Sequence, residues 1–171
     1  MNQTEDKKQR NKARTFIQLV ESNKQSMYKI ARSYLSNDED IADAIQDAIE
    51  SCWRNLDQLE KPAYFRTWMT RILIHKCIDI IRKNRREHPV SDFPEYGAEH
   101  KDLDNYEFSE LMKSLDEKYR TILLLYYGEG FKISEIAQLL DMEENTVKTR
   151  LSRGRQKFRM MWDSQDAVRQ S

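Results

Sequence analysis

The sequence predicts an all-α protein made of two small helical domains, and three observations lead to this prediction. The 171 residues include only four glycines and three prolines, so turns are few and long helices are favoured. Apolar residues recur at helical spacing, and no stretch alternates apolar and polar residues as a strand does. Residues 87–105 hold two prolines, one glycine and many acidic side chains, which is the composition of a flexible linker. We therefore expect an N-terminal domain at 1–86, an acidic linker at 87–105 and a C-terminal domain at 106–171.

Three long helices are expected in the N-terminal domain. Apolar residues repeat at helical spacing over 16–34 and predict a first helix of about 20 residues. Ser36, with Glu39 three residues later, has the form of a capping box and marks the start of a second helix. The apolar stripe of that helix runs over 41–56, and a third helix is expected at 64–86.

The C-terminal domain is expected to hold four shorter helices, at 106–115, 116–130, 131–141 and 142–158. The last two have the spacing of a helix-turn-helix, with residues 141–143 as the turn. The side chains that would pack the two helices together are Ile133, Ile136, Ala137, Leu140, Val147 and Leu151. The second helix projects Lys, Arg, Asn and Ser/Thr side chains outwards, and these are the side chains that match base edges and phosphates in a major groove.

Charge is sharply segregated although the net charge is zero. Residues 37–60 carry a balance of −7, residues 61–88 a balance of +6, and residues 89–110 a balance of −6. A protein with such blocks can bind nucleic acid without being basic overall. Neither a signal peptide nor a run long enough to span a bilayer is present, so we expect a cytoplasmic protein without membrane insertion. Cys52 and Cys77 lie in helical patterns and are expected to be buried apolar residues, not metal ligands.

Two segments together resemble a known family. The sequence EIAQLLDMEENTVKTRLSRGRQKF resembles the C-terminal DNA-binding domain of bacterial RNA polymerase sigma factors. The sequence DIADAIQDAIESCWRNLDQL, followed by YFRTWMTRILIHKCIDIIRKNRR, is similar to the promoter-melting domain of the same family. Little lies between them, as in the extracytoplasmic-function (ECF) group of the sigma-70 family. The resemblance covers roughly residues 16–158.

By this resemblance the second helix docks on core RNA polymerase. Its polar side is called the acidic face here, and its members are Asp40, Asp43, Gln46, Asp47 and Glu50. Asp43, Gln46 and Asp47 share one side of the helix because they are spaced i, i+3 and i+4. Without the resemblance, the same pattern is that of an ordinary solvated face near a helix N-terminus.

The third helix carries a second candidate surface. On a helical wheel, one narrow strip holds Trp68, Arg71, His75, Asp79 and Arg82. Its members Trp68, Arg71, His75 and Arg82 are called the basic strip here. An aromatic ring with cations suits single-stranded nucleic acid, because bases stack on aromatic faces and cations hold phosphates. The residues alone leave open that Trp68 belongs to the core and that the cations only suit a helix C-terminus.

The resemblance implies that the basic strip and the loop before it open the −10 promoter element and hold its non-template strand. The loop and its flank contribute Lys61, Tyr64, Phe65 and Arg66. His75 stands where many ECF members carry Asn, so its role in reading a base is open. Asn pairs a donor with an acceptor on one group, whereas neutral His has one of each on opposite sides of its ring.

The resemblance also implies that the last helix reads duplex DNA at the −35 element. Its candidate contacts are called the recognition face here and are Asn145, Thr146, Lys148, Thr149, Arg150, Ser152, Arg153 and Arg155. Lys132 replaces the usual serine cap before the helix-turn-helix. Asp141 replaces the usual Gly or Asn of the turn, and Asp adopts left-handed geometry more readily than most residues.

The sequence therefore predicts a promoter-recognition subunit that initiates transcription of a stress or envelope-response regulon. No enzymatic activity, cofactor or metal site is expected. The expected partners are core RNA polymerase, promoter DNA and an anti-sigma factor, which would be able to hold the protein at the membrane. The main alternative is a stand-alone helix-turn-helix regulator with a helical effector or dimerisation domain. A metal-dependent hydrolase is disfavoured, because the acidic residues from Asp38 to Asp47 come from one helix start and the other helices offer no matching set.

Overall fold

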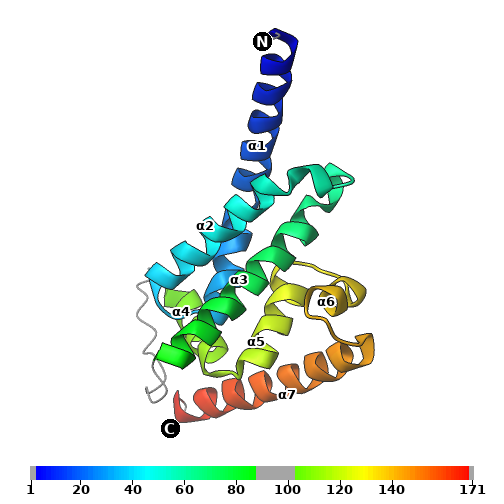
Figure 1. Ribbon diagram of the computed structural model, residues 1–171. Coiled ribbons are helices and arrows are strands. Elements are labelled where there is room, and N and C mark those ends of the chain that lie inside the picture. Colours follow the sequence, from blue (N-terminus) through cyan, green and yellow to red (C-terminus); the bar gives the residue numbers. More distant parts are fainter. Residues whose placement is uncertain (1–2, 88–102, 170–171) are drawn as a thin grey trace.

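The computed structural model describes residues 3–87 and 103–169, and every regular element in these ranges is helical, as predicted (Figure 1). The N-terminal half contains α1 (Gln3–Tyr34), α2 (Asp38–Arg54) and α3 (Phe65–Glu87), with short 3-10 turns η1 (Leu56–Gln58) and η2 (Pro62–Tyr64) between α2 and α3. The C-terminal half contains α4 (Leu103–Ser114), α5 (Glu117–Leu123), a π-helical turn η3 (Leu124–Gly128), α6 (Ile133–Leu139) and α7 (Glu144–Arg169). The expected linker lies mostly outside the described residues; Glu87 ends α3, and residues 103–105 already belong to α4.

Two helices are longer than the sequence predicted. The first has 32 residues instead of about 20, and the last has 26 residues and continues well past residue 158. The extension of α7 over residues 159–169 contains Met160, Met161 and Trp162, and the Trp162 ring stacks on that of Phe158 with centres 6.2 Å apart. The extension of α1 over residues 3–15 lacks an apolar stripe but is rich in Lys, Arg and Gln, which are good helix formers. Lengthening an existing helix costs much less than nucleating a new one, so such residues continue it without a buried face. Figure 1 shows the N-terminal part of α1 projecting beyond the rest of the protein. None of the helices in the described ranges has an apolar stretch of the length that a bilayer crossing requires.

The cap of α2 is Asn37, and the expected capping box of Ser36 with Glu39 is wrong. The Asn37 side chain accepts a hydrogen bond from the backbone N–H of Asp40 at 2.7 Å. Asn is at least as good a cap as Ser, so the one-residue shift costs the helix nothing. Three acidic residues then occupy the first turn, where the helix dipole favours negative charge.

The two halves share a single buried core, which the sequence did not predict. In Figure 1, α3 runs between α2 on one side and α5 and α6 on the other. Arg120 of α5 is only 8% exposed and donates to the backbone oxygen of Ser33 in α1 at 3.1 Å. Close by, the hydroxyl oxygens of Ser33 and Thr121 lie 3.5 Å apart. The halves therefore meet through packed helices and buried polar contacts, in addition to the chain that joins them.

The predicted helix-turn-helix is present as α6, a short turn and α7. Asp141 has φ of 49°, which is the left-handed geometry expected at this position. Ala137 is buried beneath the turn, and Val147 and Leu151 of α7 are buried as predicted. The missing serine cap at Lys132 is offset by Glu135, whose carboxylate accepts the backbone N–H of Lys132 at 2.7 Å.

Both cysteines are fully buried free thiols, as predicted. Burial raises the pKa of the Cys52 thiol from 9.0 to about 12, and the pKa of Cys77 is raised to about 12 by burial and by the nearby Glu117 carboxylate. Neither thiol therefore forms the reactive thiolate near neutral pH in the folded protein.

We expect a thiol reagent at about pH 8 to label neither cysteine until denaturant unfolds the chain. The stability associated with the buried thiols is fully present below pH 9.0 and is lost as pH rises towards about 12, because only the unfolded chain loses these protons readily. Labelling followed by mass spectrometry, with and without denaturant, measures the first effect. Rapid labelling of the native chain would contradict the buried placement.

Candidate nucleic-acid interface

The acidic face lies on the exposed side of α2, and its five members differ in their surroundings. Asp43, Gln46 and Asp47 are exposed and have no side-chain partner among the described residues. Glu50 pairs with Arg54 at 3.1 Å on the same helix. Asp40 is half-buried, and its carboxylate accepts from the Asn84 amide at 2.8 Å, which ties α2 to α3. The structure thus leaves the central three side chains free to meet a partner.

The basic strip lies along α3, where the C-terminal half covers part of it. Trp68 is partly buried, with its ring 6.2 Å from that of Phe65, so it is both a core residue and a surface residue. Arg71 is exposed and pairs with Asp141 of the helix-turn-helix at 3.4 Å. Arg82, near the C-terminal end of α3, is exposed. The apolar side of α3 faces the core, with Met69, Leu73, Ile74 and Cys77 buried.

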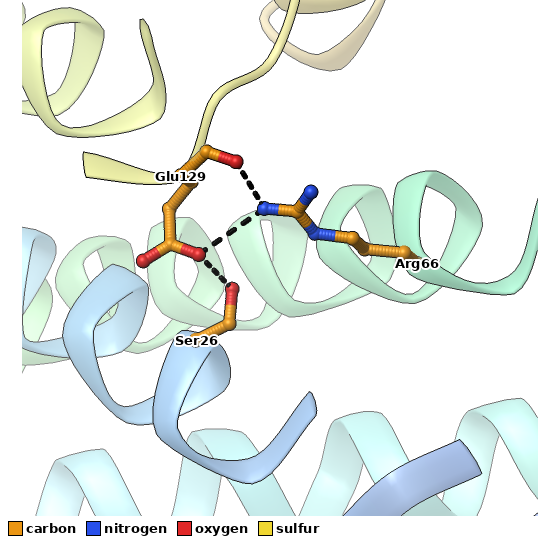
Figure 2. A network of polar contacts seen from close by, with 3 residues as sticks. All are labelled: Ser26, Arg66 and Glu129. Atoms are coloured by element: carbon orange, nitrogen blue, oxygen red, sulfur yellow. Dashed lines mark hydrogen bonds and ion pairs between the residues drawn. The ribbon is translucent and has the colours of Figure 1, made fainter. Parts of the chain in front are cut away.

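Arg66 is the most strongly engaged cation of this region (Figure 2). Its guanidinium donates to the backbone oxygen of Glu129 and lies 3.3 Å from the carboxylate of the same residue. The Ser26 hydroxyl of α1 donates to that carboxylate too, so Glu129 joins α1 to the N-terminal end of α3. The guanidinium also stacks over the Phe131 ring, 4.3 Å from its centre. Because the Glu129 side chain is only 7% exposed, this ion pair is better shielded from water than a surface pair.

His75 is exposed and lines a cavity of about 210 Å³ between the two halves. The cavity is lined from the N-terminal half by His75 and Tyr34 and from the C-terminal half by Asp141 and Arg150, among others. His75, whose role in reading a base is open, therefore shares this cavity with charged side chains of the helix-turn-helix.

The loop before α3 presents some of its expected contacts and buries one. Tyr64 is 53% exposed, and the ammonium of Lys61 lies 5.9 Å from the centre of its ring. Phe65 is only 1% exposed and packs against Phe16 with ring centres 6.0 Å apart. The expectation that Phe65 contacts DNA is therefore corrected: its ring is core, because it starts the buried side of α3.

The recognition face lies on α7 and is largely open. Seven of its eight side chains are exposed, and Arg150 is half-buried beside the interdomain cavity. Thr149 donates to the Asn145 backbone oxygen at 2.9 Å, a bond within the helix. Arg155 donates to the Tyr127 hydroxyl at 3.0 Å. The first turns of α7 thus offer amide, hydroxyl and cationic groups along one helix, as major-groove readout requires.

Comparisons with known proteins match both halves. The model for Sigma-70 region 2 matches residues 19–87, and the model for Sigma-70, region 4 matches residues 106–158. The RNA polymerase sigma factor SigV of Bacillus subtilis is 32% identical over 167 residues, a match that covers 94% of this chain and 98% of SigV. The chain belongs to the ECF group of the sigma-70 family.

Further relatives of this sigma factor agree in sequence and in fold. The ECF RNA polymerase sigma factor SigW of Bacillus subtilis is 29% identical, with 84% of this chain and 87% of SigW covered. Among solved structures, RpoE of Bartonella quintana, in complex with the anti-sigma factor NepR, superposes with a TM-score of 0.74 at 22% identity, covering 86% of this chain and 96% of RpoE. CnrH, in complex with the cytosolic domain of CnrY, gives a TM-score of 0.66 at 26% identity, covering 89% and 90%. A stand-alone regulator is not favoured, because the N-terminal half of this sigma factor matches region 2.

Sequence reasoning missed the partners of the basic cations in this sigma factor. Glu129 comes from a short segment between η3 and α6 that carries no motif, and Asp141 was considered only for its backbone geometry. Ser26 was one polar residue among many in α1. No local pattern identifies such residues, because each acts through a contact with the other half of the chain. The sequence shows only that Glu129 and Asp141 are opposite in charge to Arg66 and Arg71, and this does not indicate which residues pair.

Proposed function

We propose that this sigma factor docks on core RNA polymerase through the acidic face, reads the −35 element with the recognition face and holds the −10 non-template strand on the basic strip. The observation that carries the proposal is that three chemically different surfaces lie on separate elements of one chain with family matches in both halves. In this proposal, residues 1–86 and 106–171 are the two functional domains, and residues 87–105 tether them.

Docking is assigned to the three free side chains of the acidic face. Asp43, Gln46 and Asp47 present two carboxylates and one amide within a single helical turn. Such a patch suits a basic partner surface, where complementary charge speeds encounter and fixes the orientation of binding. Asp40 acts indirectly, because its bond to Asn84 positions α2 against α3.

Single-strand binding is assigned to the basic strip and the loop before it. Trp68 and Tyr64 offer ring faces for bases, and Arg71, Arg82 and Lys61 offer charge for phosphates. Arg66 is included as a phosphate contact once its bond to Glu129 is broken. Phe65 supports the ring of Trp68 from the core.

Duplex binding is assigned to the recognition face. Lys148 and Arg153 offer charge for phosphates or guanine edges, and Asn145 offers the paired donor and acceptor that adenine matches. Ser152 and Thr149 add smaller polar or methyl contacts. The other proposed contacts are Thr146, Arg150 and Arg155.

The proposal makes the protein a non-enzymatic initiation factor that acts in the cytoplasm, where its polymerase works. RpoE and CnrH were solved in complex with NepR and with the cytosolic domain of CnrY, and the first of these partners is an anti-sigma factor. We include an anti-sigma partner in the proposal on this basis. The promoters are expected to control a stress or envelope response.

Run-off transcription on a promoter library tests the proposed function. Core polymerase with this chain is expected to initiate at a defined subset of promoters that core polymerase alone does not use. Duplex binding of the same specificity by the free chain, without polymerase, would instead favour the stand-alone regulator.

Replacing His75 by Asn is expected to change the base preference at the −10 element. Asn pairs a donor and an acceptor on one group, whereas the imidazole separates them, so the favoured base edge differs. A matched base read by such a pair gains about 1–3 kcal/mol over the wrong base. Transcription from a library randomised at the −10 element measures the preference of both proteins. An unchanged preference would make His75 part of the scaffold and move base reading to the loop at 60–65.

A further inference from the structure

Arg155 of α7 is held by a neutral group, unlike several other cations of the protein. Its guanidinium donates to the Tyr127 hydroxyl at 3.0 Å. Lys157, on the same helix, lies instead 3.6 Å from the carboxylate of Asp116. A carboxylate partner competes with an incoming anion for the cation, whereas a hydroxyl orients the guanidinium and leaves its charge in place. Arg155 is therefore oriented and still free to bind an anion.

Tyr127 and Arg155 both keep unused hydrogen-bond donors. A tyrosine hydroxyl accepts one bond and donates another, and that of Tyr127 accepts from Arg155 but donates to no group among the described residues. The guanidinium has five N–H groups, and the Tyr127 hydroxyl is their one acceptor within residues 3–87 and 103–169. Tyr127 is 57% exposed, and Arg155 is exposed as well. Adjacent O–H and N–H donors with a positive charge match the oxygens of a phosphate.

The backbone that carries Tyr127 is fixed by its surroundings. The π-helical turn η3 is closed by a hydrogen bond from the backbone N–H of Phe131 to the Leu125 oxygen at 2.9 Å, and both of these side chains are buried. The Tyr126 ring meets that of Tyr127 edge to face, with ring centres 4.8 Å apart. The Tyr127 hydroxyl is thus presented from a rigid element, as a preorganised binding site requires.

Gly154 sets the distance between α7 and the turn. A Cβ atom at this position would lie 3.3 Å from the Cβ of Tyr119 and 3.4 Å from the Leu123 side chain, so a larger residue would push α7 away from α5. The turn η3 follows α5 directly, and Arg155 follows Gly154. The close approach of the two helices therefore brings Arg155 within reach of Tyr127.

Arg155 lies too far along α7 to enter the major groove with the first turns of the helix. Asn145 and Arg155 are about 15 Å apart along the axis, at about 1.5 Å per residue. The major groove is about 12 Å wide. If the first turns of α7 contact base edges, as the proposed function states, Arg155 reaches the edge of the groove, where the backbone phosphates run.

An open groove continues the site along the same side of α7. Lys148 precedes Arg155 by seven residues, which is two helical turns, so the two cations share one side of the helix. Lys148 lines a groove of about 660 Å³ together with Tyr126 and Lys132, and Glu144 is the one acidic residue in its lining. The groove and the Tyr127–Arg155 pair thus offer a positively charged course for one DNA strand.

We propose that Tyr127 and Arg155 form a phosphate-binding site that grips one backbone phosphate at the edge of the −35 major groove. The Tyr127 hydroxyl holds the guanidinium in position, and its own O–H donates to the same phosphate. The contact fixes the register of α7 on the duplex without reading a base. This inference rests on the proposed function, because it assigns the duplex to the recognition face.

Removing one hydroxyl is the first test. Core polymerase carrying the full-length Tyr127→Phe variant is expected to bind a promoter fragment from the run-off library about fivefold more weakly than with the unmodified chain. The matched control is Tyr126→Phe, which removes a hydroxyl that makes no hydrogen bond in the described ranges and keeps the ring pair. The control is expected to stay within about twofold. An equal loss in the two variants would overturn the inference.

Neutralising single phosphates is the second test and locates the contact. Promoter duplexes are made with one phosphate of the −35 element at a time replaced by an uncharged methylphosphonate. The unmodified chain with polymerase is expected to lose about tenfold at one phosphate at the groove edge, Tyr127→Phe about twofold there, and Arg155→Ala nothing. A purely structural role of Tyr127 would instead lower binding to every duplex by the same factor, and that result would overturn the inference.

A double-variant cycle tests whether the two side chains act as a unit. Arg155→Lys keeps the charge but loses the planar fork of N–H groups, so it is expected to cost about fivefold. Combined with Tyr127→Phe, the loss is expected to reach about tenfold and not the roughly 25-fold of independent effects. Independent effects, or Arg155→Lys binding as well as the unmodified chain, would remove Tyr127 as a positioning residue.

The outcomes separate this inference from the proposed function. Weaker binding of Tyr127→Phe to core polymerase in the absence of DNA would assign the pair to a protein contact and overturn the inference alone. An unmodified chain that gives no polymerase-dependent binding to any promoter fragment would overturn the proposed function instead.

Discussion

Replacing Asp43 and Asp47 by Lys together is expected to abolish transcription with core polymerase while leaving the fold intact. Both side chains are exposed and have no partner among the described residues, so their replacement breaks no internal contact. The change reverses two charges at the centre of the proposed docking surface. Like charges brought together at an interface cost several kcal/mol, which corresponds to a loss of about 100-fold or more in affinity. Binding to fluorescently labelled core polymerase measures the loss directly.

The matched control applies the same charge change elsewhere. Asp163→Lys/Asp166→Lys reverses two exposed carboxylates near the end of α7, outside the three proposed surfaces. This control is expected to keep polymerase binding within a factor of about three. Circular dichroism of both variants checks that the chain keeps its helical content. Polymerase binding by the Asp43/Asp47 variant that equals that of the control would remove the acidic face from the docking surface.

The sequence predicted the helices well because each of them has a local cause. The apolar stripe of α2 and the buried side of α3 follow from spacing alone, and the turn at Asp141 follows from the conformational freedom of its residue type. The errors are local too. The cap of α2 differs by one residue from the prediction because Ser36 and Asn37 are both good caps. The start of α1 was missed because the polar helix formers before residue 16 leave no apolar stripe.

The sequence predicted which residues form the candidate surfaces, but it did not predict which contacts their side chains make in the folded chain. Spacing placed Arg71 and His75 on one side of α3, but nothing in the spacing places Asp141 beside Arg71. Phe65 shows the same limit from the other direction, because an aromatic ring at the start of a helix fits a DNA-facing loop and a core equally well. Contacts between residues distant in sequence depend on how the two halves pack, and that packing has no local pattern to reveal it.

Truncating Leu73 to Ala is expected to give a large loss of stability. Leu73 is fully buried on α3, the helix that packs against α1 and α2 on one side and α6 on the other. Removing a buried leucine side chain costs about 2–5 kcal/mol, which is the lost burial plus the cavity that remains. Total stabilities of small proteins are about 5–15 kcal/mol, so the variant loses a large part of its margin. Urea unfolding followed by circular dichroism gives the difference in midpoint.

The control is Ile17→Ala on α1, which removes a similar side chain that is 60% exposed. Its effect is expected to stay within about 0.5 kcal/mol, because surface substitutions without special contacts change little. The comparison also tests the shared core. If α3 joins the two halves energetically, Leu73→Ala destabilises the helices of both halves, and hydrogen exchange of α6 and α7 becomes faster along with that of α2. Faster exchange confined to α1, α2 and α3 would show that polar contacts, and not the shared core, hold the halves together. The main contacts would then be those of Arg66 with Glu129 and of Arg120 with Ser33.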